Sequence, residues 1–574
     1  MAKPRRQRVV AALATMGLAA TLAACAADNV QVGSRPNKPS STAVAPENPE
    51  TDPSKLAIAL NTLPGYVPPT TARDGVFTKP WLNTNQQYTW SIFDQSNKLL
   101  TDYKPSQTIA WGSPDTYTTV PGVLVFRGNQ ARTAPSYGTA DITEKKLSIV
   151  WTQDIGEVSG DGSVWPGAGW TGQPLLVNWP EATRKAMGFT PEFANKNLTE
   201  VIYPTFDGHI YRMDLETGKA TKPPIDSTWG FKGTGSIDPR GYPLLYTGQG
   251  LNDRNGEIGP WRYRIYDLIQ NKEVSGWSGT DPVSSRQEWG AFDSSGLVNR
   301  QTDTLIEPGE NGLIYKVKLN TQFNPTTRKV SVNPQIVKMN FSTPVSAKHG
   351  VENSAVAYRN LMYATDNDGN LICWDANTLE VVWAANVQDD SDATMSLDET
   401  EDGVFLYTGN EVDKRGTTTD KVTQLRKFDA LTGKQVWQYD IPTQYNPNVN
   451  GGTMASPLNG KGEISDLIIY SVAKTTSDKE GTLVALDKKT GKVVWERHMA
   501  VYGWSSPVSI TGTDGHQYGI ICDYAGLMHL FDPNTGQDYA TVSLGKNVEA
   551  SPSVYNNMIV VASYAKKIFA IKVS

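Results

Sequence analysis

The chain has 574 residues, and its 53 basic and 59 acidic side chains leave a formal net charge of −6. No strongly basic stripe runs through the sequence, so nucleic acid is excluded as an expected partner. The length would allow several domains, but internal repeats assign most of it to one large unit.

The first 24 residues have the pattern of a targeting segment. Basic residues crowd positions 3–8, and the apolar run over 9–24 is shorter than the roughly 20 residues of a membrane span. The sequence LAAC at 22–25 resembles the lipobox of bacterial lipoproteins. This resemblance implies a signal peptide over 1–24, a lipid on Cys25 and a lipid anchor to the cell membrane on its extracytoplasmic side. An ordinary secretory signal cleaved nearby is the alternative.

Two further segments precede the repeats. Residues 25–74 are rich in Pro, Ser, Thr and Asn, and we expect a lipid-anchored flexible tether. Residues 75–145 contain more aromatic side chains, including Trp81, Trp90 and Trp111, and are expected to form an ordered lead-in segment. Farther along, an insertion at 179–199 carries a predicted short helix over 181–187, which begins after Pro180.

A short repeat recurs through the rest of the chain. Its clearest copy is GTLVALDKKTGKVVW at 481–495, in which two strand-forming runs flank a turn. The Asp of this turn can bond to the backbone, and its Gly supplies a positive φ. Close copies occupy 210–218, 371–383, 425–437 and 528–536, and weaker ones occupy 263–267, 313–319 and 568–572. Eight units spaced by roughly 40 to 58 residues match the period of propeller blades.

The repeat also predicts how the sheets assemble. A Ser-rich segment and a further apolar strand precede most hairpins, so each unit has about four strands, and stacking such sheets around an axis buries their faces. The last unit lacks its Trp-bearing strand, and a matching one, IVW at 149–151, stands before the first unit. We therefore predict an all-β, eight-bladed β-propeller over 146–574, with four antiparallel strands per blade and the N-terminal strand closing the last blade. The residues predicted to pack between blades are Trp151, Trp383, Trp437 and Trp495.

The motif ALD-x-x-TG-K-x-x-W at 485–495 resembles the repeat of pyrroloquinoline-quinone-type (PQQ-like) propellers. The resemblance covers about 145–574, and VLVFRGNQART at 123–133 resembles the opening segment of these proteins. It implies a quinoprotein-like fold but leaves function open. The family includes quinoprotein dehydrogenases and also non-catalytic lipoproteins, of which the propeller lipoprotein of the outer-membrane barrel-assembly machinery is the nearest functional analogue.

The sequence does not supply the catalytic set of the dehydrogenases. It has no adjacent cysteines and no C-x-x-C-H haem motif, and no motif for calcium ligands and a catalytic base matches residue by residue. Cys373 and Cys522 lie in different units and are expected to be buried free thiols. Whether the protein is an enzyme is left uncertain, a non-catalytic role is favoured, and PQQ is not expected as a cofactor.

One set of residues is a candidate site. The resemblance implies that the starts of the innermost strands meet near the propeller axis, at the mouth where members with cofactors bind them. Aligning the Ser-rich markers gives one residue for each unit, and we call this set the central funnel. Its members are Thr171, Thr234, Asp293, Glu352, Asp392, Met454, Trp504 and Glu549, and Lys232, Trp289, His349 and Asp390 flank them.

Four of the eight funnel residues are carboxylates, which raise one another's pKa in a partly desolvated site unless a cation intervenes. The cation could be a metal held by Asp293, Glu352, Asp392 and Glu549, for which calcium would fit, a Lys or Arg from the rim, or a cationic ligand. A solvated mouth with a salt-bridge network and no ligand is the alternative. The favoured function is a membrane-anchored binding or scaffold module for an envelope protein or glycan. The competing function is a PQQ- or metal-dependent oxidoreductase that uses the acidic funnel.

Overall fold

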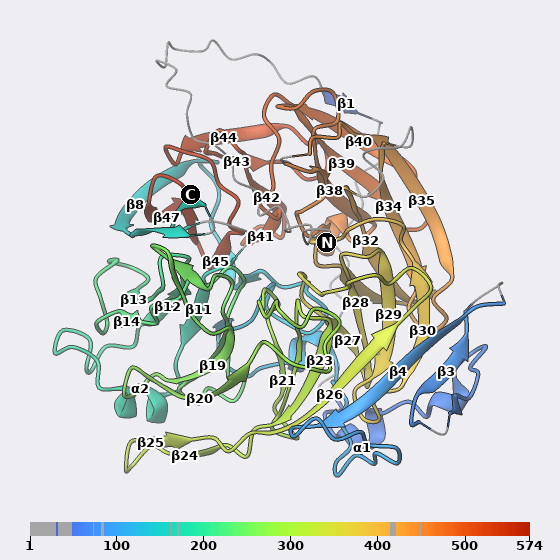
Figure 1. The fold of residues 1–574 in the computed structure, drawn as a ribbon. Helices are drawn as coiled ribbons and strands as arrows, with labels where there is room; N and C mark the ends of the chain where they lie inside the picture. Colours follow the sequence, from blue (N-terminus) through green and yellow to red (C-terminus); the bar gives the residue numbers. More distant parts are fainter. Residues whose placement is uncertain are drawn as a thin grey trace.

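The structure is a computed structural model that describes residues 30–32, 49–72, 74–81, 85–160, 162–168, 172–413, 421–447 and 449–574. Its sheets stand around a common axis, and the chain passes around the ring from green through yellow and orange to red (Figure 1). Within the described residues, no helix combines the length and the apolar character that crossing a lipid bilayer requires.

Seven blades are each built from strands that follow one another along the chain, apart from inserted hairpins. The first holds β11 (Leu175–Asn178), β12 (Thr199–Pro204), β13 (His209–Asp214) and β14 (Ile225–Asp226), the second β15 (Ser236–Ile237), β16 (Leu244–Gly248), β19 (Arg262–Asp267) and β20 (Lys272–Ser278), and the third β21 (Leu297–Asn299), β22 (Thr304–Pro308), β23 (Leu313–Lys318) and β26 (Gln335–Ser342). The fourth holds β27 (Val356–Tyr358), β28 (Leu361–Thr365), β29 (Asn370–Asp375) and β30 (Val381–Asn386), and the fifth β31 (Ser396–Thr400), β32 (Gly403–Thr408), β34 (Val422–Asp429) and β35 (Gln435–Pro442). The sixth holds β36 (Gly451–Gly452), β37 (Leu458–Asn459), β38 (Leu467–Ala473), β39 (Gly481–Asp487) and β40 (Val493–Met499), and the seventh β41 (Val508–Gly512), β42 (Gln517–Cys522), β43 (Leu527–Phe531) and β44 (Asp538–Ser543).

The prediction of eight blades is wrong, because the described chain completes seven in sequence order. The sheet that joins the two ends of the ring, here the closing sheet, has only three strands of its own repeat, β45 (Ser553–Tyr555), β46 (Met558–Ser563) and β47 (Lys567–Val573). Its outer strand is β8 (Leu147–Asp154), which pairs antiparallel with β47, so an early segment of the chain does join the last sheet. On its inner side β6 (Ser136–Tyr137) pairs in parallel with β45.

The four tryptophans of the repeat lie between neighbouring sheets. Each donates its indole N–H to a backbone carbonyl in the hairpin turn of the next sheet: Trp151 to Leu215, Trp383 to Ala430, Trp437 to Lys488 and Trp495 to Pro533, at 2.8–3.1 Å. Each ring also covers the turn glycine, and a Cβ added at Gly491, for example, would lie 2.7 Å from Trp437. This explains why the Thr-Gly turn and the Trp recur together.

Residues 123–132 are all buried and form what we call the central plug. They hydrogen-bond to the innermost strands of several blades, with Leu124 O accepting from Ile237 N and Gln130 O accepting from Ala357 N. The guanidinium of Arg127 donates to carbonyls of Pro457 and Pro507, and that of Arg132 to carbonyls of Ala355 and Ser295. Because these carbonyls belong to four different blades, the plug fills the middle of the ring.

The N-terminal segments extend two blades outward. In the third, β4 (Gln87–Asp94) pairs with β26 and continues the sheet through β3 (Phe77–Pro80) and β2 (Thr70–Thr71) (Figure 1). In the sixth, the backbone of β1 (Val30–Val32) pairs with β40. Short strands β5 (Gly122–Val123) and β7 (Thr139–Ala140) extend the first and seventh sheets, and β33 (Glu411–Val412) extends the sixth by pairing with β36. Separate hairpins are formed by β9 (Glu157–Gly160) with β10 (Ser163–Pro166), β17 (Asp253–Arg254) with β18 (Glu257–Ile258), and β24 (Gln322–Asn324) with β25 (Lys329–Ser331).

The structure differs from the expected tether at residues 49–72, which contact the fourth blade. This stretch contains α1 (Pro53–Leu56) and a 3-10 turn (Leu60–Thr62). Leu63 is buried, Ile58 N donates to the Asn360 side chain, and the Tyr66 hydroxyl donates to Glu380. The insertion in the first blade does form the expected helix, α2 (Glu181–Met187), and Cys373 and Cys522 are buried free thiols.

Candidate functional site in the central funnel

Five residues of the predicted funnel line one small cavity of about 20 Å³. They are Thr234, Asp293, Glu352, Asp392 and Met454, and Phe126 of the central plug lines the same cavity. Each funnel residue stands shortly before the innermost strand of its blade, which is why different repeats bring them together. Thr171 lies outside the described residues.

Trp504 and Glu549 do not line this cavity. Trp504 is 2% exposed and packs in an aromatic cluster with Tyr502 and Tyr524. Glu549, the next funnel position along the chain, is buried. It accepts hydrogen bonds from the Asn547 amide and from the Tyr564 hydroxyl, at 3.1 and 2.6 Å. The ring of funnel positions therefore has an acidic side and an aromatic side.

The first acidic cluster consists of Asp293, Glu310 and Glu352, from which one carboxylate oxygen each lies within 4.8 Å of the others. Lys232 neutralises it from the second blade: its Nζ lies 2.5 Å from Asp293 Oδ2 and 3.3 Å from Glu352 Oε2. Arg286 adds an ion pair of 3.2 Å to Glu310. A lysine, one of the cations that the sequence analysis left open, thus stands at this cluster.

The second acidic cluster consists of Asp390, Asp392 and Glu411, again with one oxygen each within 4.8 Å of the others. Glu411 is 1% exposed, and it accepts hydrogen bonds from Asn450 and from the backbone N–H of Asp392. Oδ1 of Asp390 and Oδ1 of Asp392 are buried without a hydrogen-bond partner among the described residues. This cluster therefore concentrates carboxylates that are less well neutralised than those of the first.

Burial and mutual repulsion shift the pKa values of both clusters. Burial raises the pKa of Asp293 to about 6, even though Lys232 opposes the shift, and burial together with Glu352 raises the pKa of Glu310 to about 8. Burial also raises the pKa of Glu411 to about 8 and those of Asp390 and Asp392 well above the ordinary value. For Glu352, burial acts upward, but Lys232 and Arg286 outweigh it and lower its pKa.

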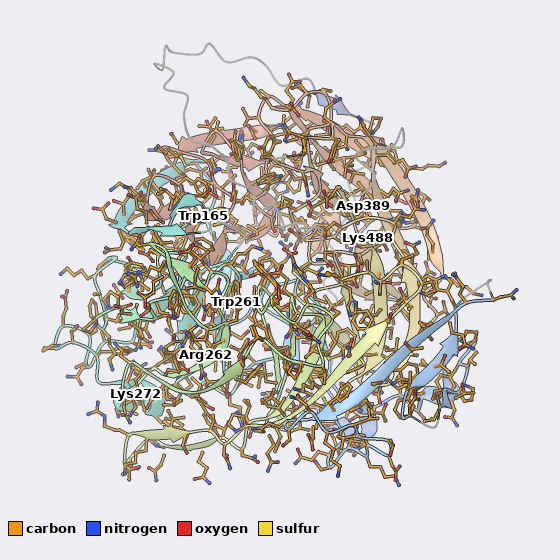
Figure 2. The ribbon with its side chains drawn as sticks, in the orientation of Figure 1. Trp165, Trp261, Arg262, Lys272, Asp389 and Lys488 are labelled. Atoms are coloured by element: carbon orange, nitrogen blue, oxygen red, sulfur yellow. The ribbon has the colours of Figure 1, made fainter. Side chains whose placement is uncertain are left out.

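Two other predicted flanking residues, Trp289 and His349, pack against aromatic rings. Trp289 lies 4.8 Å from Trp261, between ring centroids, and 5.6 Å below the Arg286 guanidinium. His349 packs against Phe341, and burial lowers its pKa to about 4. In Figure 2, Trp261 and Asp389, which precedes Asp390, lie toward the middle of the ring, whereas Lys272 lies at its outer edge.

The two clusters differ from the predicted calcium site. Asp293 and Glu352 lie in the first cluster, Asp392 lies in the second, and Glu549 belongs to neither. Among the described residues, the oxygen sets that could hold a hard cation are therefore Asp293, Glu310 and Glu352, where Lys232 already stands, and Asp390, Asp392 and Glu411.

Glu310, Glu411 and Arg286 were missed by the sequence analysis, which aligned only the starts of the innermost strands. Glu310 and Glu411 come two or three residues after the second strands β22 and β32. The turns after these strands carry acids in other repeats too, at Asp207, Asp366 and Asp523. Aligning the second strands as a separate set would have identified this ring of acids.

Comparison with known proteins agrees with this architecture. Residues 329–466 and 479–573 match the family model described as "Outer membrane protein assembly factor BamB". Over this part of the chain, the propeller repeat is therefore of the PQQ-like kind. The resemblance that the repeat motif indicated is thereby confirmed.

Individual comparisons match parts of two quinoprotein dehydrogenases and a crystal structure of BamB. The chain is 28% identical over 148 residues to a quinoprotein alcohol dehydrogenase, PedH, of Pseudomonas putida and 25% identical over 138 residues to a quinoprotein ethanol dehydrogenase of Pseudomonas aeruginosa. These matches cover 24% and 21% of the chain and 20% of each dehydrogenase, so it spans a fifth of their length. The crystal structure of BamB from Moraxella catarrhalis superposes with a TM-score of 0.47 at 15% identity, covering 74% of this chain and 100% of that one.

Proposed function

We propose that the protein is a non-catalytic binding or scaffold module that presents a rigid propeller to an envelope protein or glycan. The observation that carries this proposal is the packing of the central funnel. Its cavity of about 20 Å³ has room for about one water molecule or one ion, whereas pockets for organic ligands usually measure about 300–1,000 Å³.

A quinone cofactor does not fit the residues present in the funnel. The amine of Lys232 stands between Asp293 and Glu352, and Phe126 of the central plug lines the same small cavity. Arg127 and Arg132 bind the plug to four blades, so making room for a multi-ring cofactor would break several buried hydrogen bonds. The match to the BamB family model also supports a non-catalytic binding function. The matches to dehydrogenases keep the oxidoreductase as the competing function.

Reconstitution separates the two functions. Purified protein mixed with calcium and a saturating excess of PQQ is expected to show no change in quinone absorbance and no rise in melting temperature, because a ligand that binds only the folded state must stabilise it. A quinoprotein alcohol dehydrogenase treated in parallel serves as the positive control. Stoichiometric quinone uptake with alcohol-dependent reduction of an electron-accepting dye would overturn the non-catalytic assignment.

The proposed location follows from the lipobox at Cys25, which lies outside the described residues. Two acyl chains on one Cys give firm anchoring, because each buried CH₂ contributes about 0.8 kcal/mol. In a bacterial host, the Cys25→Ala variant is expected to lose incorporation of labelled palmitate and to leave the membrane fraction, while wild-type protein and a Cys373→Ala control keep both. Palmitate on the Cys25→Ala protein would contradict the anchor.

A further inference from the structure

A cavity of about 280 Å³ lies at the other end of the innermost strands from the acidic funnel. Its lining includes the ends of β27 and β31 and the residues after β37, whereas Glu352, Asp392 and Met454 precede these same strands. Gln130 of the central plug and the neighbouring Thr133 line it from the axis. We call this cavity the plug pocket, and the plug separates it from the funnel.

Two buried polar atoms on the lining of the plug pocket lack a partner within the described residues. They are the donor Nε1 of Trp111 and the acceptor Oε1 of Gln130. Both residues are nearly inaccessible to solvent: Trp111 is 4% exposed and Gln130 is 2% exposed. A buried polar atom without a hydrogen bond costs about 1–3 kcal/mol. A ligand that both accepts from the indole and donates to the amide would recover this cost.

The charges of the plug pocket favour an anionic ligand. Arg359 and Lys461 contribute positive charge to the lining. Of the two acids present, Asp398 is neutralised by a 2.8 Å ion pair with Lys488, whereas Glu399 keeps its charge and accepts a 2.9 Å hydrogen bond from the Tyr358 hydroxyl. The two cations therefore leave a net positive charge on the lining. Apolar contacts come from Leu56, Pro114, Ala357 and Leu397.

We infer that the plug pocket binds a ligand in which a secondary amide stands next to a carboxylate. The amide carbonyl would accept from Trp111 and its N–H would donate to Gln130, while the carboxylate would face Arg359 and Lys461. The volume suits a fragment of about two amino acids. This chemistry occurs at the carboxyl end of a peptide chain and also in small N-acyl amino acids. The inference deepens the proposed binding function and rests on it.

Titration calorimetry with N-acetyl-L-alanyl-L-alanine tests the plug pocket. We expect saturable one-to-one binding with a Kd at or below about 1 mM, and at least tenfold weaker binding of the matching C-terminal amide, which lacks the charge. Lys461→Gln and Arg359→Gln are each expected to weaken the dipeptide at least tenfold, and Lys461→Arg to keep most of the affinity. Trp111→Phe, which removes only the indole donor, is expected to weaken it about fivefold.

Lys489→Gln is the matched control for the lysine variant, because Lys489 is 79% exposed and pairs with Asp402 outside the pocket. Melting temperatures of all variants establish that they are folded. A pentapeptide ending in Ala-Ala that binds as tightly as the dipeptide identifies a chain end, whereas binding of N-acetyl-alanine alone identifies a small metabolite.

No heat from the dipeptide at millimolar concentration would overturn the inference, and so would binding that is unchanged in Lys461→Gln or in Trp111→Phe. The last result would mean that the indole N–H faces the adjoining cavity of about 10 Å³, which shares Trp111 and Gln130 and is at the limit for one water molecule. Quinone uptake would instead remove the proposed function and leave this titration unaffected, so the two failures are distinguishable.

Discussion

Replacing Arg127 with methionine is expected to lower the free energy of unfolding by at least about 3 kcal/mol, the largest effect of any single substitution considered for this propeller. The guanidinium is 1% exposed and donates to the carbonyls of Arg132, Pro457 and Pro507 at 3.1, 2.9 and 3.2 Å. Methionine keeps most of the stem volume but leaves three buried carbonyls without these donors, at about 1–3 kcal/mol each.

The charge of Arg127 makes this interaction unusual. No carboxylate contributes to its hydrogen bonds, and burial alone lowers its pKa to about 9. The backbone carbonyls therefore have to replace the hydration of a full positive charge, and the same carbonyls fix the plug to the sixth and seventh blades. A neutral side chain at this position removes the charge and the cross-blade connection together.

Arg254→Met is the matched control for this experiment. The Arg254 side chain is 30% exposed and donates to one backbone carbonyl, that of Thr228, at 2.8 Å. Its replacement is expected to change the unfolding free energy by less than about 1 kcal/mol. Urea unfolding followed by tryptophan fluorescence compares the two variants with wild-type protein. If Arg127→Met were as stable as Arg254→Met, the plug would not hold the ring together.

The hairpin repeat was predictable because its signals are local. An Asp, a Thr-Gly turn and a Trp within a dozen residues specify two strands, their turn and the surface on which the next sheet packs, as Gly491 and Trp437 illustrate. The residue before each Ser-rich marker could be identified for the same reason. The structure brings five of these residues to one cavity: Thr234, Asp293, Glu352, Asp392 and Met454.

The remaining features depend on contacts between distant parts of the chain. Arg127 bonds to carbonyls 330 and 380 residues away in sequence, so no window around it could reveal that it fills the axis. The composition of residues 49–72 suggests a tether, yet Tyr66 meets Glu380 across 314 residues. The number of blades was overestimated because repeat counting took the last three strands, completed by 149–151, as an eighth blade. The described chain completes seven blades in sequence order, and the closing sheet takes its outer strand from 147–154.

Replacing Glu411 with glutamine is expected to stabilise the protein at pH 8, by on the order of 2 kcal/mol, and to flatten the dependence of its stability on pH. Glutamine has the same shape, and its carbonyl can still accept from Asn450 or from the Asp392 N–H, which lie 2.8 and 3.3 Å from the Glu411 carboxylate. Its amide can donate toward the unpartnered oxygens of Asp390 and Asp392. The substitution thus removes one of three crowded negative charges without opening a cavity.

The direction of the pH effect follows from the raised pKa values. A carboxyl group whose pKa is higher in the folded state binds more protons there than in the unfolded chain, so the unfolding free energy falls as the pH rises. In the wild-type protein, the stability gained from binding these protons in the folded state is fully present below the ordinary carboxyl pKa of about 4. It is lost as the pH rises through about 6, where Asp293 titrates, and about 8, where Glu310 and Glu411 titrate.

Urea unfolding at intervals between pH 5 and pH 9 measures this profile. Wild-type protein is expected to be most stable near pH 5 and to weaken toward pH 9, and Glu411→Gln is expected to show a smaller decline. The control is Glu216→Gln, at a side chain that is 75% exposed, which is expected to reproduce the wild-type curve. A Glu411→Gln curve parallel to that of the wild type would mean that the second acidic cluster does not share its charge repulsion through Glu411. A cation that neutralises Asp390 and Asp392 in solution would produce that result, because the carboxyl groups would then stay ionised across the whole range.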